Sequence, residues 1–146
     1  MANNSDSEDE DLIDERLNGR DATIFLLDAS SSMFENSEES DSPFLLALKC
    51  VHHILCNKIL SSDQDSVAVV LFGTNFKGED EKYGVYSHTC VLKDLLPPNV
   101  ETILQIENLI SKKQALDSYA AAATSPSLVP SLADGLWLCS SIFSKQ

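Results

Sequence analysis

The sequence predicts a single α/β domain, and three observations carry that prediction. Residues 22–27 and 67–72 are apolar throughout, and a segment with helical spacing of apolar residues lies between them. Strands that are apolar on both faces are typical of a parallel sheet covered by helices. A strand, a helix and a second strand within about 50 residues form a βαβ unit, which predicts that the two strands run parallel with a right-handed crossover.

The expected boundaries of that unit follow from its end signals. The first apolar run ends at Asp28, where the strand is expected to stop. Ser42 is a good N-cap and Pro43 suits the first helical position, so a helix is expected from there to residues 61–62. The second strand is expected at residues 67–72, after Asp65.

The second half of the chain predicts one more strand and two more helices. Residues 85–92 alternate weakly and are expected to form an antiparallel edge strand. A helix is expected to start at residues 97–99, with Ile103, Ile106, Leu109 and Ile110 inward, and residues 115–130 look irregular. Ser131 is expected to cap a last helix, whose predicted buried face is Leu132, Leu136, Cys139 and Phe143.

The predicted sheet has fewer strands than the apolar sequence of its first strand requires. The first strand is as apolar as a central strand, yet only one neighbouring strand is available to it, which leaves an apolar edge exposed. We therefore expect an α/β sheet that is truncated after about three strands and three helices, as the N-terminal part of a longer protein. Expressed alone, it is expected to aggregate.

Charge and composition limit the function. The chain has 146 residues, 43% of them apolar, and a net charge of −13. Seven acids and no base lie in residues 1–15, so residues 1–18 are predicted to be a disordered acidic leader and residues 19–146 the folded domain. The excess of acidic residues excludes a segment that binds nucleic acid by itself, because binding to phosphates requires a basic surface. No membrane span or signal peptide is predicted, and the four cysteines are expected to be reduced core residues.

The candidate site is Asp28-Ala29-Ser30-Ser31-Ser32, directly after the first strand. In open α/β sheets, ligands bind at the carboxyl ends of strands. One carboxylate and two hydroxyls at alternate positions, Asp28, Ser30 and Ser32, are the oxygen donors that Mg²⁺ prefers. The alternative is that both serines satisfy loop backbone.

This D-x-S-x-S pattern resembles the opening of the metal-ion-dependent adhesion site of von Willebrand factor A domains. The resemblance implies a Rossmann-like, doubly wound sheet. Members of that family also use a threonine from a later loop and a further acid. The region Thr124 to Ser131 contains no clear match for the threonine, and no acid follows a further strand.

An enzymatic alternative uses the same aspartate. Haloacid dehalogenase-type phosphatases place a nucleophilic Asp after the first strand, but they need a second acid two residues on, where this chain has Ser30. No G-x-G-x-x-G follows either strand, and no G-x-x-x-x-G-K-[ST] occurs. The sequence therefore favours a non-catalytic domain and supplies no residues for an ATPase.

From Gly19 onward, the order of motifs resembles the N-terminal A-like domain of the seventy-kilodalton subunits of the Ku family. The block Ile59-Leu60-Ser61-Ser62-Asp63, followed by a strand that ends in Phe72-Gly73-Thr74, is the most specific part. Further matching stretches are Gly19-Arg20-Asp21, Ile24-Phe25-Leu26-Leu27-Asp28-Ala29-Ser30, Met33-Phe34-Glu35, Val91-Leu92-Lys93-Asp94-Leu95 and Leu136-Trp137-Leu138-Cys139.

The resemblance implies a nuclear protein of double-strand break repair. Ku is a heterodimeric ring that threads onto DNA ends, recruits the DNA-dependent protein kinase catalytic subunit and end-joining factors, and also acts at telomeres. In that family the ring that encircles DNA, the interface with the larger Ku subunit and the C-terminal DNA-binding module lie mainly downstream of the A-like domain. The A-like domain itself lies at the periphery and serves mostly protein contacts.

The resemblance also limits what can be expected of the site. The family predicts a vestigial Mg²⁺ site at Asp28, Ser30 and Ser32, and no other cofactor. Ku subunits have been labelled ATP-dependent helicases, and an abasic-end lyase activity has been attributed to a lysine directly after the Asp-Ala-Ser. Schiff-base chemistry needs an amine, and this chain has Ser31 there, so the lyase activity is not carried over. The alternative function is a metal-dependent A-type interaction domain unrelated to repair.

Overall fold

The computed structural model describes residues 20–36, 40–61, 65–75, 81–84, 86–120 and 131–145. Within them, three strands form one mixed sheet in the order β1-β2-β3. The strands are β1 (Ala22–Asp28), β2 (Ser66–Phe72) and β3 (Thr89–Leu96). The leader predicted at residues 1–18 lies outside the described residues, as do residues 121–130 of the segment expected to be irregular. That expectation is wrong for residues 115–117, which belong to a short helix over Lys113–Asp117.

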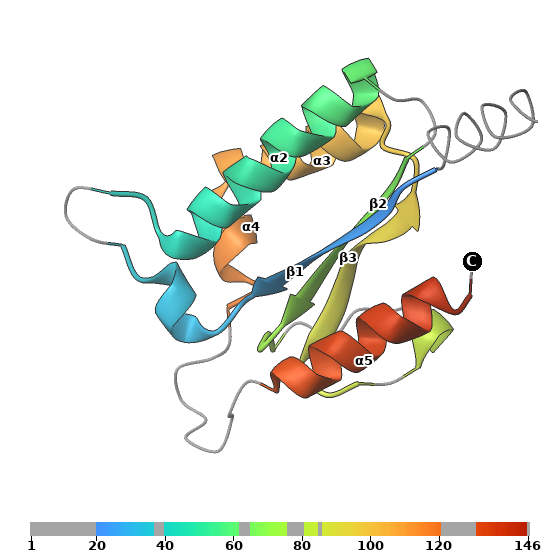
Figure 1. The fold of residues 1–146 in the computed structure, drawn as a ribbon. Coiled ribbons are helices and arrows are strands. Elements are labelled where there is room, and N and C mark those ends of the chain that lie inside the picture. Colours follow the sequence, from blue (N-terminus) through green and yellow to red (C-terminus); the bar gives the residue numbers. More distant parts are fainter. Residues whose placement is uncertain are drawn as a thin grey trace, which may run out of the picture.

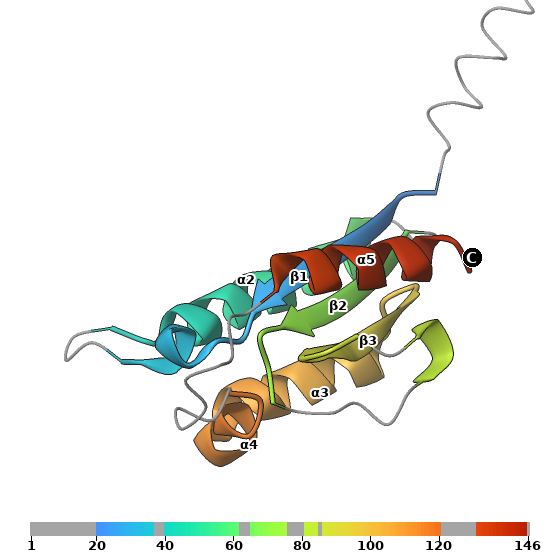
Figure 2. The same ribbon diagram turned by 90° about the horizontal axis from the view of Figure 1, so that it is seen from below.

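Helices cover both faces of this sheet, so the domain has three layers (Figures 1 and 2). Helices α2 and α3 lie on one face and α5 lies on the other. The helical elements are η1 (Ser31–Phe34), α2 (Pro43–Ser61), η2 (Glu81–Tyr83), α3 (Val100–Ser111), α4 (Lys113–Asp117) and α5 (Leu132–Phe143). The predicted α/β class is confirmed.

The βαβ unit forms as predicted. Strands β1 and β2 pair in parallel, with Leu27 opposite Leu71, and α2 connects them. The caps predicted at Ser42 and Ser131 also hold, and Asn99, within the expected start of a helix, caps α3 in the same way. Ser42 Oγ accepts from Leu45 N at 3.4 Å, Asn99 Oδ1 from Thr102 N at 2.8 Å, and Ser131 Oγ from Asp134 N at 3.3 Å.

Strand β3 is antiparallel to β2, as predicted, but it begins four residues later than expected, at Thr89. A turn occupies the start of the predicted range: His88 has a φ of 57°, and Thr89 Oγ1 donates to Tyr86 O at 3.0 Å. The pairing with β2 is irregular near Val69, which blurs the two-residue alternation that a regular edge strand would show.

Helix α5 forms at the expected position but packs through a different face. Its buried residues are Gly135, Leu138 and Ile142. The predicted inward face is wrong, since Leu132, Leu136 and Phe143 are about half exposed and only Cys139 is partly buried. Gly135 decides the orientation: a Cβ there would lie 3.1 Å from both Leu26 Cδ1 and Phe72 Cβ. The helix approaches the sheet on the side that has no side chain.

The core consists of two apolar clusters separated by the sheet. Odd-numbered residues of β2 join α2 and α3 in the first cluster, and even-numbered residues join α5 in the second. The ring of Phe34 stacks on Phe44 at 4.4 Å between centroids, so η1 is attached to the start of α2. This contact positions the loop after β1.

Helix α2 is long and apolar enough to cross a membrane by length and composition. The prediction that no segment reaches that length is therefore wrong on that criterion. Core helices of soluble proteins pass the same test, and α2 buries Phe44, Leu48, Val51 and Leu55 against the sheet. We interpret α2 as a core helix.

Candidate functional site

The predicted site begins where β1 ends. Ala29 is fully buried and its N–H donates to Phe72 O at 2.8 Å, so β1 stays attached to β2 one residue past its last pair. The carboxylate of Asp28 accepts a hydrogen bond from Ser30 N, through Oδ1, at 2.8 Å. An aspartate that bonds backbone two residues on closes a tight turn, and this turn directs the chain away from the sheet.

The two serines of the motif lie next to each other after this turn. Ser30 Oγ and Ser32 Oγ are 3.3 Å apart, within hydrogen-bond distance. Met33 N donates to Ser30 O at 3.0 Å, which starts the short helix η1. The structure thus gathers Asp28, Ser30 and Ser32 in one turn at the carboxyl end of β1, as their spacing predicted.

These oxygens form an incomplete set for a cation. Mg²⁺ takes six oxygens in nearly octahedral geometry, and the motif offers one carboxylate and two hydroxyls. Among the residues that the structure describes, no group of three or more His, Cys, Asp or Glu side chains is placed to hold a metal ion. Of the region considered for the family's threonine, residues 124–130 are outside the described residues, and Ser131 Oγ caps α5. The donors are of the right chemical type, and their observed bonds equally satisfy the turn.

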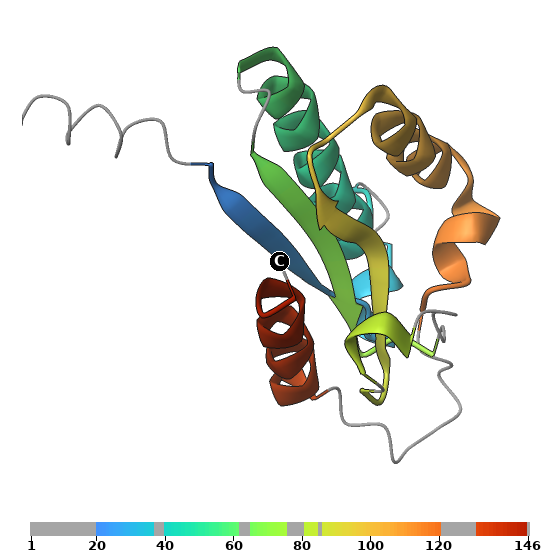
Figure 3. The same cartoon turned by 90° about the vertical axis from the view of Figure 1, so that its right-hand side faces the viewer.

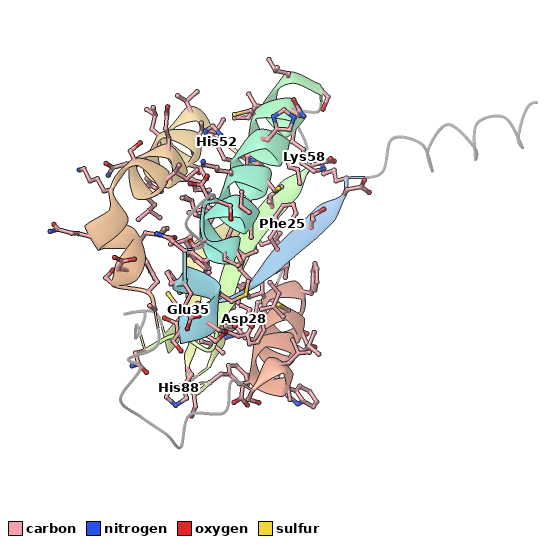
Figure 4. All side chains as sticks on the ribbon, turned by 90° about the vertical axis from the view of Figure 1, so that its left-hand side faces the viewer. Phe25, Asp28, Glu35, His52, Lys58 and His88 are labelled. Carbon is pink, nitrogen blue, oxygen red and sulfur yellow. The ribbon has the colours of Figure 1, made fainter. Side chains whose placement is uncertain are left out.

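A further polar side chain at this end of the sheet was not predicted. Thr74, two residues after β2, is fully buried, and its Oγ1 donates to Tyr119 O at 2.5 Å. Its N–H donates to His88 O at 3.1 Å. Asp28 and His88 lie toward the same end of the molecule (Figure 4). Thr74 therefore ties together the end of β2, the turn before β3 and the segment after α4.

Nucleophiles and imidazoles elsewhere do not add a reaction centre to the described part of the chain. All four cysteines are free, but only Cys90 is fully buried, so the expectation of core cysteines is wrong for the exposed Cys50. Burial raises the pKa of the Cys90 thiol to about 11, which keeps it protonated and unreactive. His52 Nε2 lies 4.0 Å from Cys56 Sγ on its own helix, and His53 Nε2 lies 3.2 Å from Asn57 Nδ2.

The opposite end of the sheet is held by a charged connection. Lys58 Nζ and Asp65 Oδ2 are 2.6 Å apart and both side chains are largely buried. Asp65 Oδ1 also accepts from Asp21 N at 3.1 Å. One carboxylate thus joins the end of α2, the start of β1 and the segment that leads into β2, which makes it a structural group.

Comparison with known proteins identifies the domain. Residues 22–146 match the family model described as the Ku70/Ku80 N-terminal alpha/beta domain. The chain is 34% identical over 134 residues to the "X-ray repair cross-complementing protein 6" of Mus musculus. It is also 34% identical over 125 residues to the "ATP-dependent DNA helicase ku70" of Dictyostelium discoideum, and over 128 residues to the "ATP-dependent DNA helicase 2 subunit 1" of Rhipicephalus appendiculatus.

The similarity covers most of this chain and a small part of each relative. It extends over 88% of the chain and 21% of the mouse protein, and over 86% of the chain and 13% of the Dictyostelium protein. The chain therefore spans about a fifth or less of the length of these curated relatives. The match to the family model, over residues 22–146, includes both strands of the βαβ unit and the Asp28 turn.

Proposed function

This chain belongs to the family of Ku70/Ku80 N-terminal alpha/beta domains, and from that premise we propose that it is part of a Ku-type subunit in DNA double-strand break repair. The observation that carries the proposal is the family match, which runs from the first residue of β1 to the end of the chain. Its relatives bear the names of Ku70 and of an X-ray repair protein. The metal-dependent interaction domain unrelated to repair has no comparable support.

Within that function we assign this segment to protein contacts. The chain has a net charge of −13, of which the segment after residue 15 holds −6. Binding to DNA phosphates requires a basic surface, and the affinity of such binding falls steeply as the salt concentration rises. DNA ends are then held by other regions of the assembled protein, while this acidic domain faces proteins.

The proposed partners follow from the family. They are the larger Ku subunit, the DNA-dependent protein kinase catalytic subunit and end-joining factors, and the proposed location is the nucleus, with a second role at telomeres. The test is to tag the protein at its own locus and purify it from cells with nuclease-induced breaks. We expect the larger Ku subunit to co-purify. Recovery without any Ku partner, from cells in which Ku assembles on breaks, contradicts the proposal.

A binding experiment separates this segment's role from that of the assembly. The purified 146-residue chain is mixed with linear duplex DNA, with closed circular DNA as the control, at low and physiological salt. We expect no retention of either DNA, because the segment is acidic. Salt-sensitive binding of linear DNA by this chain alone contradicts its assignment to protein contacts and leaves the family membership untouched.

For the Asp28 turn we propose a vestigial cation site that binds Mg²⁺ weakly. The support is the set of Asp28, Ser30 and Ser32 in one turn, together with the bonds that already occupy them. Calorimetric titration of the chain with Mg²⁺ should show binding only in the millimolar range. Asp28→Ala removes it and Asp41→Ala, on an exposed acid elsewhere, does not. Micromolar affinity that survives Asp28→Ala contradicts this site.

We further propose that the domain itself is not catalytic. The helicase names belong to the relatives, and the turn after β1 carries a serine where a phosphatase needs its second acid. Assays of the chain with ATP and with an activated phosphate ester should show no turnover. Turnover that is abolished by Asp28→Asn would establish the phosphotransferase alternative.

A further inference from the structure

Helix α2 carries a histidine and a cysteine whose side chains meet one turn apart. His52 Nε2 and Cys56 Sγ are 4.0 Å apart. The two residues have the i, i+4 spacing at which side chains lie one above the other on one face of a helix. Imidazole nitrogen and cysteine sulfur are the ligand types that hold Zn²⁺ in structural sites. The pair therefore has the donor chemistry of a metal site.

The distance between the two atoms suits a metal ion that binds both. Zn–S bonds are about 2.3 Å long and Zn–N bonds about 2.0–2.1 Å, so two ligands of a tetrahedral ion have their donor atoms roughly 3.6 Å apart. His52 Nε2 and Cys56 Sγ would have to approach each other by only about 0.4 Å. Small rotations within the side-chain rotamers supply a movement of that size.

The pair lies on the side of α2 that is turned toward α3. Lys58 marks the other side, since it bonds to Asp65, which also holds the start of β1. His52 and Cys56 lie about 120° and 160° around the helix from Lys58, and Figure 4 shows His52 on the α3 side and Lys58 on the β1 side. Figure 3 shows α3 beside α2 on the β3 side of the sheet. Both ligands come from one helix that the structure describes throughout.

The accessibility of the pair also suits a metal site. Both side chains are half-buried, so an ion can reach them from solvent while their neighbours restrict their rotamers. Among the described residues, no third His, Cys, Asp or Glu joins them in a group that could hold a metal ion. Water is therefore the ligand for the remaining coordination positions.

We propose that His52 and Cys56 form a two-ligand Zn²⁺ site on α2, with water completing the coordination. On binding, the Cys56 thiol releases its proton to solvent and the sulfur bonds to zinc, while neutral His52 binds through Nε2. With two protein ligands instead of four, the expected Kd is about 10 µM, weaker than in structural zinc sites. Mg²⁺ prefers oxygen ligands, so this site is separate from the turn at Asp28.

The first test is calorimetric titration of the purified, reduced chain with Zn²⁺, with millimolar Mg²⁺ present to occupy oxygen sites. His52→Ala and Cys56→Ala should each weaken binding at least tenfold, because one ligand is lost. The matched controls are His53→Ala and Cys50→Ala, which remove the same side chains from exposed positions of the same helix. Both controls should bind Zn²⁺ within about twofold of the wild-type affinity.

The second test identifies the ligands with Co²⁺ in place of Zn²⁺. A thiolate bound to Co²⁺ gives a charge-transfer band in the near ultraviolet, which the wild-type chain and His53→Ala should show and Cys56→Ala should not. His52→Cys keeps two metal ligands at the same spacing, so it should bind Zn²⁺ and give a stronger band with Co²⁺. Binding by this variant separates the loss of a ligand from damage to the helix.

Three outcomes overturn the proposal. A wild-type chain that binds Zn²⁺ only in the millimolar range has no such site. Losses in His53→Ala or Cys50→Ala that equal those in His52→Ala and Cys56→Ala place the metal elsewhere. A His52→Cys variant that is folded by circular dichroism and does not bind Zn²⁺ shows that the i, i+4 pair does not hold the metal.

Discussion

Strands β1 and β2 lie side by side in parallel register, and each is an uninterrupted run of apolar residues. The five central residues of β2 are completely buried, with helices on both faces and a strand on each side. No residue of β1 is completely buried, since residues 23–28 are all partly exposed and Ala22 is exposed. Neighbouring strands of equal apolarity thus have different environments.

The difference lies in strand pairing, because helices cover both strands on both faces. Side chains that alternate across a strand report what covers its two faces. They say nothing about the hydrogen-bonding edges, which depend on how many strands the sheet contains. Strand β1 is as apolar as β2, although among the described residues it pairs with one strand and β2 pairs with two.

The largest expected effect comes from truncating matched leucines in the two strands. Leu71 and Leu27 are register partners, but Leu71 is fully buried and Leu27 is half-buried. Leu71→Ala should lower the free energy of unfolding by about 3 kcal/mol, and Leu27→Ala by about 1 kcal/mol, because the lost transfer energy and the cavity scale with burial. Urea unfolding of both variants measures the difference. Equal losses would show that β1 is as enclosed as β2 in solution.

The helix that spans both strands gives the next largest effect. A Cβ at Gly135 would lie 3.1 Å from Leu26 Cδ1 and from Phe72 Cβ. Gly135→Val should therefore lower the free energy of unfolding by about 2 kcal/mol, because the added side chain forces α5 away from both β1 and β2. Ala133→Val, at an exposed position of the same helix, should cost only about 0.5 kcal/mol through helix propensity. A stable Gly135→Val variant, measured by thermal unfolding, contradicts the close approach.

The parts of the fold that local signals determine could be predicted from sequence. The βαβ unit depends on two apolar runs and on the cap at Ser42. Asn99 and Ser131 cap their helices by accepting a hydrogen bond from the backbone N–H three residues later in the sequence. The buried face of α5 could not be predicted in this way. Two apolar stripes compete on that helix, and the choice between them depends on the close approach of Gly135 to two distant strands.

The candidate site shows the same division. Asp28, Ser30 and Ser32 come together because one turn holds them, so spacing alone predicted their cluster. Thr74 was missed because its partner, Tyr119, lies 45 residues away. The available signal was its position two residues after β2, which matches the position of Ser30 after β1, although nothing in the sequence showed which carbonyl it would bond.

A smaller effect is expected at the amino ends of the two strands. Asp65 bonds Lys58 and the backbone of Asp21 in a largely buried setting, so Asp65→Ala should cost about 1–2 kcal/mol. The matched control is Asp41→Ala, which breaks the exposed pair with Lys49 and should cost less than about 0.5 kcal/mol. Chemical denaturation compares the two. Equal costs would mean that the Asp65 connection does not hold β1 to β2.

The smallest expected effect measures how well water is excluded from the Cys90 thiol of β3, the strand that pairs with β2. Cys90 of β3 pairs with Leu71, and burial raises the pKa of its thiol from 9.0 to about 11. Between those values the folded chain keeps a proton that the unfolded chain has lost, so the free energy of unfolding falls as the pH rises. The stabilising contribution is complete below pH 9 and disappears as the pH passes about 11. Its size is on the order of 1 kcal/mol.

Other groups titrate in the same range, and burial also raises the pKa of Tyr119. The measurement is therefore the difference in unfolding free energy between the wild-type chain and Cys90→Ala, followed from pH 8 to pH 10.5 in urea. Wild type should lose stability faster than the variant as the pH rises, and Cys50→Ala, at an exposed thiol of α2, should follow wild type. Parallel curves for wild type and Cys90→Ala would mean that water reaches the β3 side of β2, and the contrast between the enclosed β2 and the open β1 would then weaken.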